Sequence, residues 1–440
     1  MAYCLNSGGW DVTLVEGGNA FGGAVQSVSW GALQLDLGCH LFDNKTDQLT
    51  DIFFDMGGGK SEFRPLDVRY ASYSQGKLSK GIAVMDLSGL SDHERGALLL
   101  DYLRSRTDVA SACSSLMEKY IERYGPKLGS FVAFGAKKMF ALDAGKISPR
   151  GLEVGPFQRV CLIPGASGRL LKQLPELDES LAVSSADCPL EFYPEANSYP
   201  ARNFYPAKGG LSGFINSLTE VLANRGVALY SNAKLEDVKQ MTGHVQVACT
   251  HFKQKKFDAV ISTISMEGIE TEWLGSSRLQ SAYHYVPMVL FYARIRPDDL
   301  TGLYYVHNYD LKDYAFRISA PGLYGNQVDN EGYTYICFEC PTQIGSSLWD
   351  EPVGNYVEAL TSESVKTGIL CSGAKAVDWK KVSAKKTFRL PLVGAEELEA
   401  RVLRDFSIKY PNLTLFDRDN GAKTDILNDA MRLVSNIESS

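Results

Sequence analysis

The sequence predicts an α/β protein of about three domain-sized units, or of two with one interrupted by the other. A short amphipathic stretch followed by an apolar run opens the sequence at residues 2–15, and a second short strand pattern returns at residues 258–263. Between residues 286 and 386, aromatic and polar positions alternate as they do in sheets. At about 150 residues per domain, 440 residues suffice for two or three such units.

The composition is that of a folded globular protein, with 45% hydrophobic and 22% charged residues. The formal net charge is −7 and no long basic run occurs, so we expect no nucleic-acid partner. Nowhere do about 20 apolar residues run together, which argues against a transmembrane helix and leaves a peripheral membrane contact open. Nine scattered cysteines form no disulfide framework and no leader is visible, so we expect a reducing, cytoplasmic compartment.

In chain order, residues 2–15 predict a helix, a Gly8-Gly9 turn and a buried strand, the end of a strand–helix–strand unit. Residues 43–59 predict a helix that is stopped by glycines, and residues 64–79 predict antiparallel strands. Three helical patterns between residues 87 and 174 indicate a helical insert. The first part of the chain is therefore predicted to contain both helices and strands.

The second half begins with a Gly-rich turn, an amphipathic helix, a break at Gly226 and a strand, all within residues 204–238. A short buried strand follows at residues 258–263, and residues 286–386 predict a mixed or antiparallel sheet. A polar loop then leads to a C-terminal helix over residues 426–437.

The strand that ends at Glu16 is the first feature that suggests a chemistry. Val12-x-Leu14-x-Glu16 is an apolar strand ending in an acid. At the end of the second strand of a dinucleotide-binding unit, a carboxylate can accept both hydrogen bonds from an adenosine ribose. Because strands also often end in an exposed acid, this pattern alone leaves a cofactor role and a purely structural one open.

The residues that follow favour the cofactor role. Gly22-Gly23 come six and seven residues after Glu16, then Ser27, and further on Asp36-x-Gly38-x-His40-x-Phe42. With this continuation the sequence resembles the FAD-dependent oxidoreductases that include flavin amine oxidases, protoporphyrinogen oxidase, phytoene desaturases and UDP-galactopyranose mutase. The resemblance implies that Glu16, Gly22, Gly23, Ser27 and Gly38 lie along FAD, where glycines let the backbone approach the ribose and pyrophosphate.

Later segments extend the resemblance. Residues 204–213 resemble the turn that returns the chain to the FAD domain, and Val238 occupies the place where relatives hold the adenine. Near the C-terminus, Arg418 and a helix that begins near Asn428 and Asp429 resemble the segment approaching the isoalloxazine ring. A helix N-terminus there stabilises the negative charge of a reduced flavin.

The resemblance thus implies a Rossmann-like FAD-binding domain made of residues 1–62, 203–268 and 388–440. The remaining residues, 63–202 and 269–387, would form a mixed-sheet substrate domain with the helical insert at about 88–175. Two features depart from the family: Ala20 and Ala24 replace the arginines that flank the glycine pair, and the GxGxxG strand-turn that holds the pyrophosphate would lie before Met1. We expect either an upstream start or a fragment, the alternative being a protein that has lost FAD binding.

Three residues are candidates for positions near the flavin. His40 lies in the flavin-proximal motif, where it contacts cofactor or substrate or is held for structure. Tyr305 and Arg317 belong to an aromatic, basic cluster that suits an aromatic wall and an anionic substrate group, although tyrosines at alternating positions also simply pack. Cys337-x-x-Cys340 lacks the second pair that a zinc site needs, so no metal is predicted.

The function we expect is oxidation of a small organic substrate, with FAD taking a hydride from a C–N or C–C bond. No Ser-His-Asp arrangement or nucleophile elbow is visible. One alternative is an enzyme like UDP-galactopyranose mutase, which uses reduced FAD without net redox change on a nucleotide sugar. The other is a binding protein that retains the fold without its cofactor. The sequence predicts no particular oligomeric state.

Overall fold

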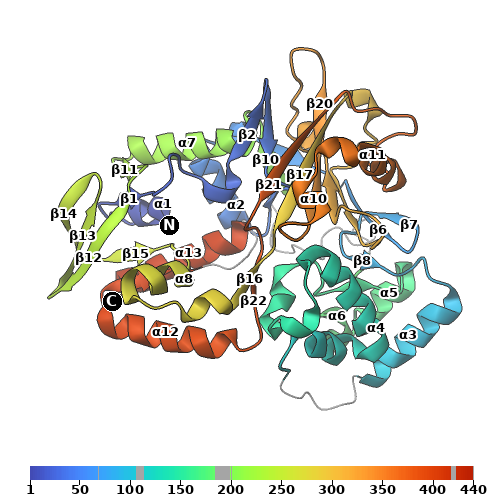
Figure 1. The fold of residues 1–440 in the computed structure, drawn as a ribbon, viewed down its shortest axis with the longest axis horizontal. Helices are drawn as coiled ribbons and strands as arrows, with labels where there is room; N and C mark the ends of the chain where they lie inside the picture. Colours follow the sequence, from blue (N-terminus) through green and yellow to red (C-terminus); the bar gives the residue numbers. More distant parts are fainter. Residues whose placement is uncertain (68, 106–112, 184–198, 200, 418–422, 440) are drawn as a thin grey trace.

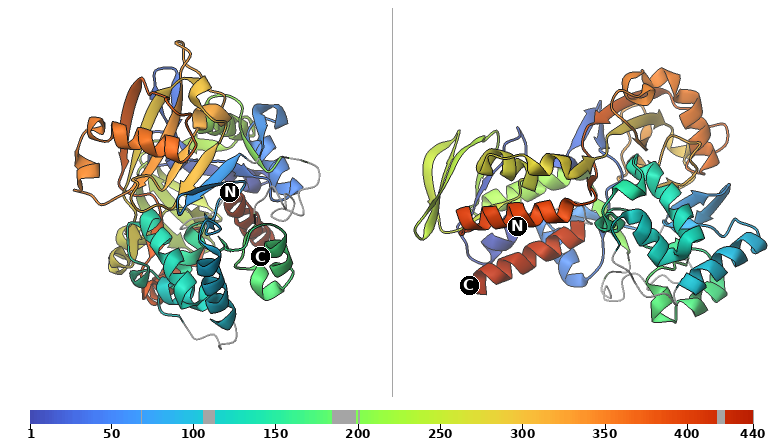
Figure 2. Two further views of the ribbon diagram at one scale, coloured as in Figure 1. Left: turned by 90° about the vertical axis from the view of Figure 1, so that its right-hand side faces the viewer. Right: turned by 60° about the horizontal axis from the view of Figure 1, so that its bottom comes forward.

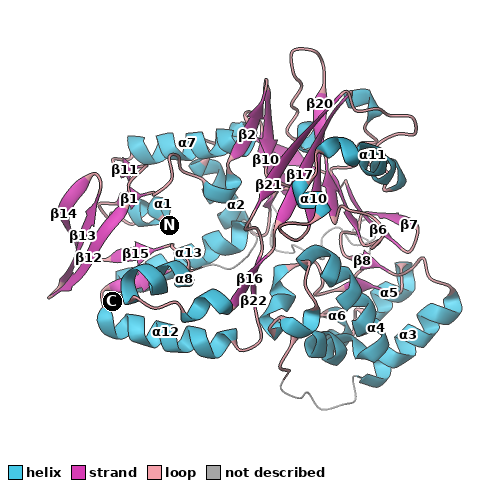
Figure 3. Cartoon of the chain, viewed as in Figure 1, coloured by secondary structure: helices cyan, strands magenta, loops and turns pink. Residues whose placement is uncertain are grey.

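The computed structural model describes residues 1–67, 69–105, 113–183, 199, 201–417 and 423–439. Figure 1 shows three regions: short parallel strands with helices on the left, a large sheet at the upper right, and a bundle of helices at the lower right. Figure 3 shows the same division by secondary structure. The predicted α/β class is confirmed.

The parallel strands come from four distant segments. Strand β1 (Thr13–Val15), which follows helix α1 (Ala2–Ser7), pairs in parallel with β11 (Ala228–Tyr230). Strand β15 (Val260–Ser262) pairs in parallel with β23 (Leu413–Leu415). In the described part of the chain these pairs are two separate two-stranded sheets rather than one continuous sheet.

Helices and a β-meander surround these strands. The meander consists of β12 (Leu235–Met241), β13 (His244–Cys249) and β14 (Phe252–Phe257). The helices are α2 (Asp47–Met56), α7 (Gly210–Asn224), α8 (Met266–Ile269), α12 (Ala395–Lys409) and α13 (Lys423–Ser439). Figure 2 shows α12 and α13 at one end of the molecule and the helical bundle at the other.

The large sheet has seven strands in the order β21-β17-β20-β19-β18-β6-β7. All neighbours are antiparallel except β18 and β6, so the sheet is mixed, as predicted. In chain order the strands are β6 (Tyr70–Ser74), β7 (Lys77–Lys80), β17 (Met288–Ile295), β18 (Tyr305–Asn308), β19 (Arg317–Ser319), β20 (Thr334–Pro341) and β21 (Asp378–Ala384).

The two faces of this sheet differ in character because side chains alternate along each strand. One face is apolar: Phe291, Ile318 and Phe338 pack there against Leu360 of helix α11 (Val357–Lys366). The other face carries His307, Arg317 and Glu339, which are neighbours across β18, β19 and β20. This second, polar face is the one that meets the segment around Gly38.

Smaller sheets connect the regions. They are formed by β2 (Ser27–Trp30) with β3 (Leu33–Asp36), by β10 (Asn203–Pro206) between β4 (Phe42–Asp43) and β5 (Phe63–Leu66), by β16 (Tyr283–Tyr285) with β22 (Arg389–Pro391), and by β8 (Met85–Asp86) with β9 (Val160–Cys161). Short helices α9 (Pro321–Tyr324) and α10 (Ser347–Asp350) flank the large sheet.

The helices predicted between residues 87 and 174 are present, with one difference. The helical bundle contains α3 (Asp92–Ser105), α4 (Leu116–Phe140), α5 (Gly165–Leu171) and α6 (Pro175–Asp178). Two of the predicted helices merge into α4, which is interrupted at Gly125 with φ 79° and ψ 166°. In the sequence, the glycine before Pro126 reads as the end of one helix and the start of another. In the structure, buried apolar side chains on both halves of α4 hold the two halves together.

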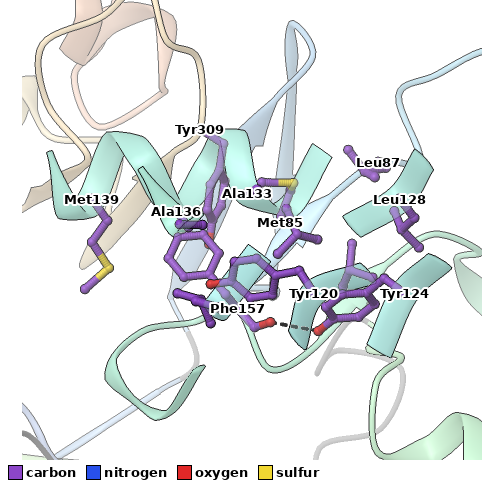
Figure 4. Close-up of a cluster of buried hydrophobic side chains, with 14 of the residues drawn as sticks. Met85, Leu87, Tyr120, Tyr124, Leu128, Ala133, Ala136, Met139, Phe157 and Tyr309 are labelled. Atoms are coloured by element: carbon purple, nitrogen blue, oxygen red, sulfur yellow. Dashed lines mark hydrogen bonds between the residues drawn. The ribbon is translucent and has the colours of Figure 1, made fainter. Parts of the chain in front are cut away.

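The bundle surrounds its own aromatic core (Figure 4). Tyr120, Tyr124 and Phe157 are fully buried there, and the Tyr124 hydroxyl donates to the Phe157 carbonyl oxygen at 2.7 Å. Met85 and Tyr309 belong to the same cluster, so the bundle packs against the end of the large sheet.

The C-terminal helix begins earlier than the sequence predicted. Helix α13 starts at Lys423, and Asn428 and Asp429 lie within its second turn rather than at its N-terminus. Its polar first turn, Lys423 to Asp425, hides the helical pattern, because only the later residues repeat an apolar face. The other predicted helices and strands are confirmed within a few residues.

Candidate functional site

The residues predicted to hold the nucleotide end of a cofactor begin at Glu16. Its backbone N–H continues the β1–β11 pairing by donating to Tyr230 O at 2.8 Å. Its carboxylate accepts the Gly18 N–H at 2.6 Å and remains partly exposed. An acid is therefore present where the chain leaves the parallel strands, as the sequence predicted.

The glycine pair lies next to helix α7. Gly22 has φ 112°, and a Cβ there would lie 3.1 Å from Ile215 of that helix. Gly23 has φ 51°, and no described atom lies within 4 Å of the Cβ position it lacks. The backbone thus packs closely against α7 at one glycine and is open to a ligand at the next.

Ser27 is engaged within the protein. Its N–H donates to Ser212 Oγ at 2.9 Å, and its hydroxyl donates to Asp36 Oδ1 at 2.9 Å. Asp36 is fully buried and also accepts hydrogen bonds from the Tyr205 hydroxyl and the Leu211 N–H at the start of α7. Burial raises the pKa of Asp36, and its hydrogen-bond donors oppose that rise.

Gly38 and Cys39 rest on the polar face of the large sheet. Gly38 has φ 108°, and a Cβ there would lie 3.0 Å from the Glu339 carboxylate. The Cys39 N–H donates to Glu339 Oε1 at 3.0 Å. Arg317 holds the same carboxylate with two hydrogen bonds of 2.6 Å, from Nε and Nη2. Burial lowers the pKa of Arg317, whereas Glu339, Cys39 and Tyr305 together raise it above its usual value.

His40 is held in one tautomer. Its Nε2 lies 3.2 Å from the Leu37 carbonyl oxygen, which can only accept, so Nε2 carries the proton. Its Nδ1 lies 3.4 Å from Lys423 Nζ, at the start of α13, and accepts from that ammonium. Burial holds the pKa of His40 well below its usual value, and Lys423 and Arg317 lower it further. His40 is therefore a neutral acceptor that orients Lys423.

Tyr305 forms an aromatic wall beside Arg317. Its ring stacks on Tyr70 of the neighbouring strand, with centroids 5.4 Å apart and an angle of 19° between planes. His307 lies two residues on, 5.3 Å from the Tyr305 ring, and its Nδ1 is 2.6 Å from Ala83 O. Burial is the main reason that the pKa of Tyr305 is raised well above its usual value.

The structure therefore brings Gly38, Cys39, His40, Tyr305, Arg317, Glu339 and Lys423 together, and we call these seven residues the junction site. All three flavin-proximal candidates from the sequence belong to it. Glu339 and Lys423 were missed. A buried acid within the apolar run of β20 is costly unless it is paired, and this was a usable sequence signal for Glu339. Lys423 lies in a polar stretch that reads as a loop, and no sequence signal marks it.

The remaining predicted positions lie elsewhere. Val238 is on β12 and packs with the apolar cluster of Ile269, Phe406, Tyr410 and Leu413. Asn428 is partly buried on α13, and Asp429 lies 4.0 Å from Arg432 of the same helix. Arg418 lies outside the described residues. Cys337 and Cys340 are buried in different clusters on opposite faces of the large sheet, so they cannot share one metal ion.

Together these features define an α/β protein whose polar junction lies where the segment predicted to approach a cofactor meets a large mixed sheet. A sequence profile of the flavin-containing amine oxidoreductases matches residues 1–296, and the chain belongs to this family. None of the described helices is long and apolar enough to cross a bilayer. No curated protein sequence matches the chain.

Several solved structures share the fold. A reduced UDP-galactopyranose mutase is 13% identical with a TM-score of 0.72, covering 100% of this chain and 90% of that one. A protein from Exiguobacterium sp. 255-15, named as a candidate protoporphyrinogen oxidase, is 16% identical with a TM-score of 0.66, covering 99% and 95%. Putrescine oxidase bound to putrescine is 10% identical with a TM-score of 0.62, covering 100% and 96%.

Proposed function

We propose that this protein is an FAD-dependent oxidoreductase that takes a hydride from a C–N or C–C bond of a small organic substrate. The observation that carries the proposal is the junction site. There, the segment predicted to lie along the flavin, Gly38 to His40, meets Arg317 and Tyr305, which were predicted to face the substrate. Membership of the flavin-containing amine oxidoreductases supports the same reading.

The proposal includes a Rossmann-like FAD-binding domain of residues 1–62, 203–268 and 388–440, with residues 63–202 and 269–387 forming the substrate domain. The parallel pairs β1–β11 and β15–β23 support this division, because each joins segments far apart in the sequence. The scattered cysteines favour a reducing, cytoplasmic compartment.

The residues present fit FAD at both ends. Glu16 offers a partly exposed carboxylate for a ribose, and the open backbone at Gly23 allows close approach of the cofactor. Toward the flavin end, Gly38, His40 and the first turn of α13 would hold the ring. Val238, Arg418, Asn428 and Asp429 complete the proposed cofactor set. Bound FAD would supply the hydride acceptor, and the chain supplies position and charge.

On the substrate side, Tyr305 stacks on the buried Tyr70 and is itself only partly buried, so its ring could pack against an organic group. Arg317 uses Nε and Nη2 for Glu339, so its Nη1 remains to orient a polar group, and its side chain is 20% exposed. The hydroxyl of Ser319 is buried and has no hydrogen-bond partner among the described residues. Such a group is satisfied when a polar ligand binds.

The test is the visible absorption spectrum of the purified chain after addition of FAD and removal of the unbound excess. We expect an oxidised-flavin spectrum that bleaches without oxygen when a candidate amine, porphyrinogen or polyene is added, and the compound that bleaches it names the substrate class. A protein that stays colourless would contradict the proposal and leave a fold without its cofactor.

A mutase-like activity is the second candidate, favoured by the TM-score of 0.72 over the whole chain to the reduced mutase. Such an enzyme would bind FAD, would bleach only with dithionite, and would convert a nucleotide sugar only after that reduction. The same preparation therefore separates the two activities.

A further inference from the structure

We propose that Glu339 is a positioning residue that locks the Gly38–Cys39 backbone to Arg317 and thereby sets how tightly the protein holds FAD. The inference rests on the proposed function, because it assigns a role to Glu339 in that same site. It goes beyond it by naming a residue that would touch neither cofactor nor substrate.

The contacts of Glu339 carry the inference. Its carboxylate accepts three hydrogen bonds: two from the Arg317 guanidinium at 2.6 Å each and one from the Cys39 N–H at 3.0 Å. The donors come from positions about 280 residues apart in the sequence. One buried carboxylate, 3% exposed, therefore joins the flavin-proximal segment to the substrate-facing strand β19.

The surrounding geometry makes the link stiff. Gly38 sits so close to the Glu339 carboxylate that a Cβ would lie 3.0 Å from it, and its φ of 108° suits only glycine. Arg317 grips both oxygens in a bidentate pair, which fixes the plane of the carboxylate. A rotation of Glu339 would therefore break the Arg317 pair and release the Cys39 N–H together.

The Gly38–Cys39 backbone held by Glu339 leads directly into residues that are proposed to face the cofactor. Cys39 is followed by His40, whose ring orients Lys423 at the start of α13. A shift of the Gly38–Cys39 backbone moves this proposed cofactor-facing wall, whereas the rest of the sheet is held by its own strand pairing.

The test compares two buried glutamates of the large-sheet region. Glu363, 4% exposed, accepts the N–H groups of Tyr314 and Ala315, neither of which belongs to the junction site, so it serves as the matched control. We would titrate FAD into the wild type, Glu339→Gln and Glu363→Gln and follow flavin fluorescence. We expect the Kd for FAD to rise at least tenfold in Glu339→Gln and to stay within twofold in Glu363→Gln.

A second substitution guards against simple misfolding. Arg317→Lys keeps the positive charge and removes the two-pronged grip, so we expect a smaller rise in the Kd for FAD in a folded protein. Equal Kd values for wild type, Glu339→Gln and Arg317→Lys would overturn the proposal, as would equal effects of the two glutamate variants.

If the wild type binds no FAD, the proposed function fails and the link is judged by hydrogen exchange instead. The Cys39 amide should then exchange at least tenfold faster in Glu339→Gln than in the wild type. In Glu363→Gln the hydrogen exchange of the Ala315 amide should become faster, whereas that of the Cys39 amide should stay unchanged. An unchanged exchange rate of the Cys39 amide in Glu339→Gln would by itself contradict the proposal that Glu339 holds the Cys39 backbone.

Discussion

At the scale of single residues, the junction site depends on backbone and protonation states that few residue types can supply. Gly38 holds φ 108° against a carboxylate, and His40 stays neutral so that it can accept from Lys423. His307 is likewise buried and neutral beside Arg317. Each of these states can be tested by one substitution.

Gly38→Ala should destabilise the protein by about 1–3 kcal/mol, because the new Cβ meets Glu339 and the φ is strained for an L-residue. Gly31→Ala is the control, since Gly31 has φ 60° and no described atom within 4 Å of its Cβ position. Denaturant unfolding measures both. Equal losses in free energy of unfolding would show that the contact with Glu339 is unimportant.

His307 should make the protein less stable in acid. Burial first, and then Arg317, lower the pKa of His307 to about 3, while the unfolded chain titrates near 6.5. Between these values the unfolded state binds the extra proton, so stability is full above about pH 6.5 and falls as the pH drops toward 3.

The measurement is the free energy of unfolding at pH 7 and pH 5. His307 should account for a loss of about 2 kcal/mol over this range, which His307→Phe should remove. His93→Phe, at an exposed position of α3, should keep the wild-type loss. A variant at position 307 with the wild-type pH dependence would contradict the assignment.

At the scale of elements, α4 shows how one helix spans a break. Its halves meet at Gly125, where a Cβ would lie 2.9 Å from Asp101 Oδ2 of α3. The same carboxylate oxygen accepts the Lys127 N–H at 2.8 Å, which satisfies a donor that the interruption exposes. The break is therefore part of how α3 and α4 pack.

Gly125→Ala should cost about 2 kcal/mol or more in free energy of unfolding, since it combines a strained φ with a clash. Gly96→Ala in the middle of α3, with open space around the Cβ position, should instead stabilise the protein by about 0.5–1 kcal/mol. Thermal unfolding of both variants checks the opposite signs. A stabilising Gly125→Ala would mean that α4 is uninterrupted in solution.

At the scale of the whole molecule, buried tyrosines of the large sheet connect it to β3. The Tyr292 hydroxyl donates to Asp36 O at 2.7 Å, and the Tyr335 hydroxyl donates to Gln34 O at 2.7 Å. Asp36 in turn holds Ser27 and the start of α7. These bonds tie the predicted cofactor side to the predicted substrate side beside the junction site.

Tyr292→Phe should cost about 1–3 kcal/mol, because the buried Asp36 carbonyl oxygen loses its donor. Tyr73→Phe, on the apolar face of the same sheet, should cost less than about 0.5 kcal/mol. Urea unfolding of the two variants gives the comparison. Similar small losses in free energy of unfolding for both variants would show that the Tyr292–Asp36 hydrogen bond contributes little to holding the large sheet against β3.

The amino-acid sequence by itself determined the local features of this protein. The apolar run before Glu16, the glycines after it, the helical insert and the alternating strands follow from periodicity and from turn residues, which act within a few positions of the chain. The same alternation placed Tyr305 and Arg317 on strands, and the resemblance of the motif around Gly38 predicted a segment close to a flavin.

Only the tertiary structure decided which of these residues meet. Glu339 and Lys423 join Gly38–His40 across about 300 and 380 positions, and no local pattern records a contact of that range. The early start of α13 and the union of two predicted helices in α4 were also set by packing, which outweighs weak local signals. The junction site exists because burial makes each isolated charge costly, so that distant polar side chains are stable only together.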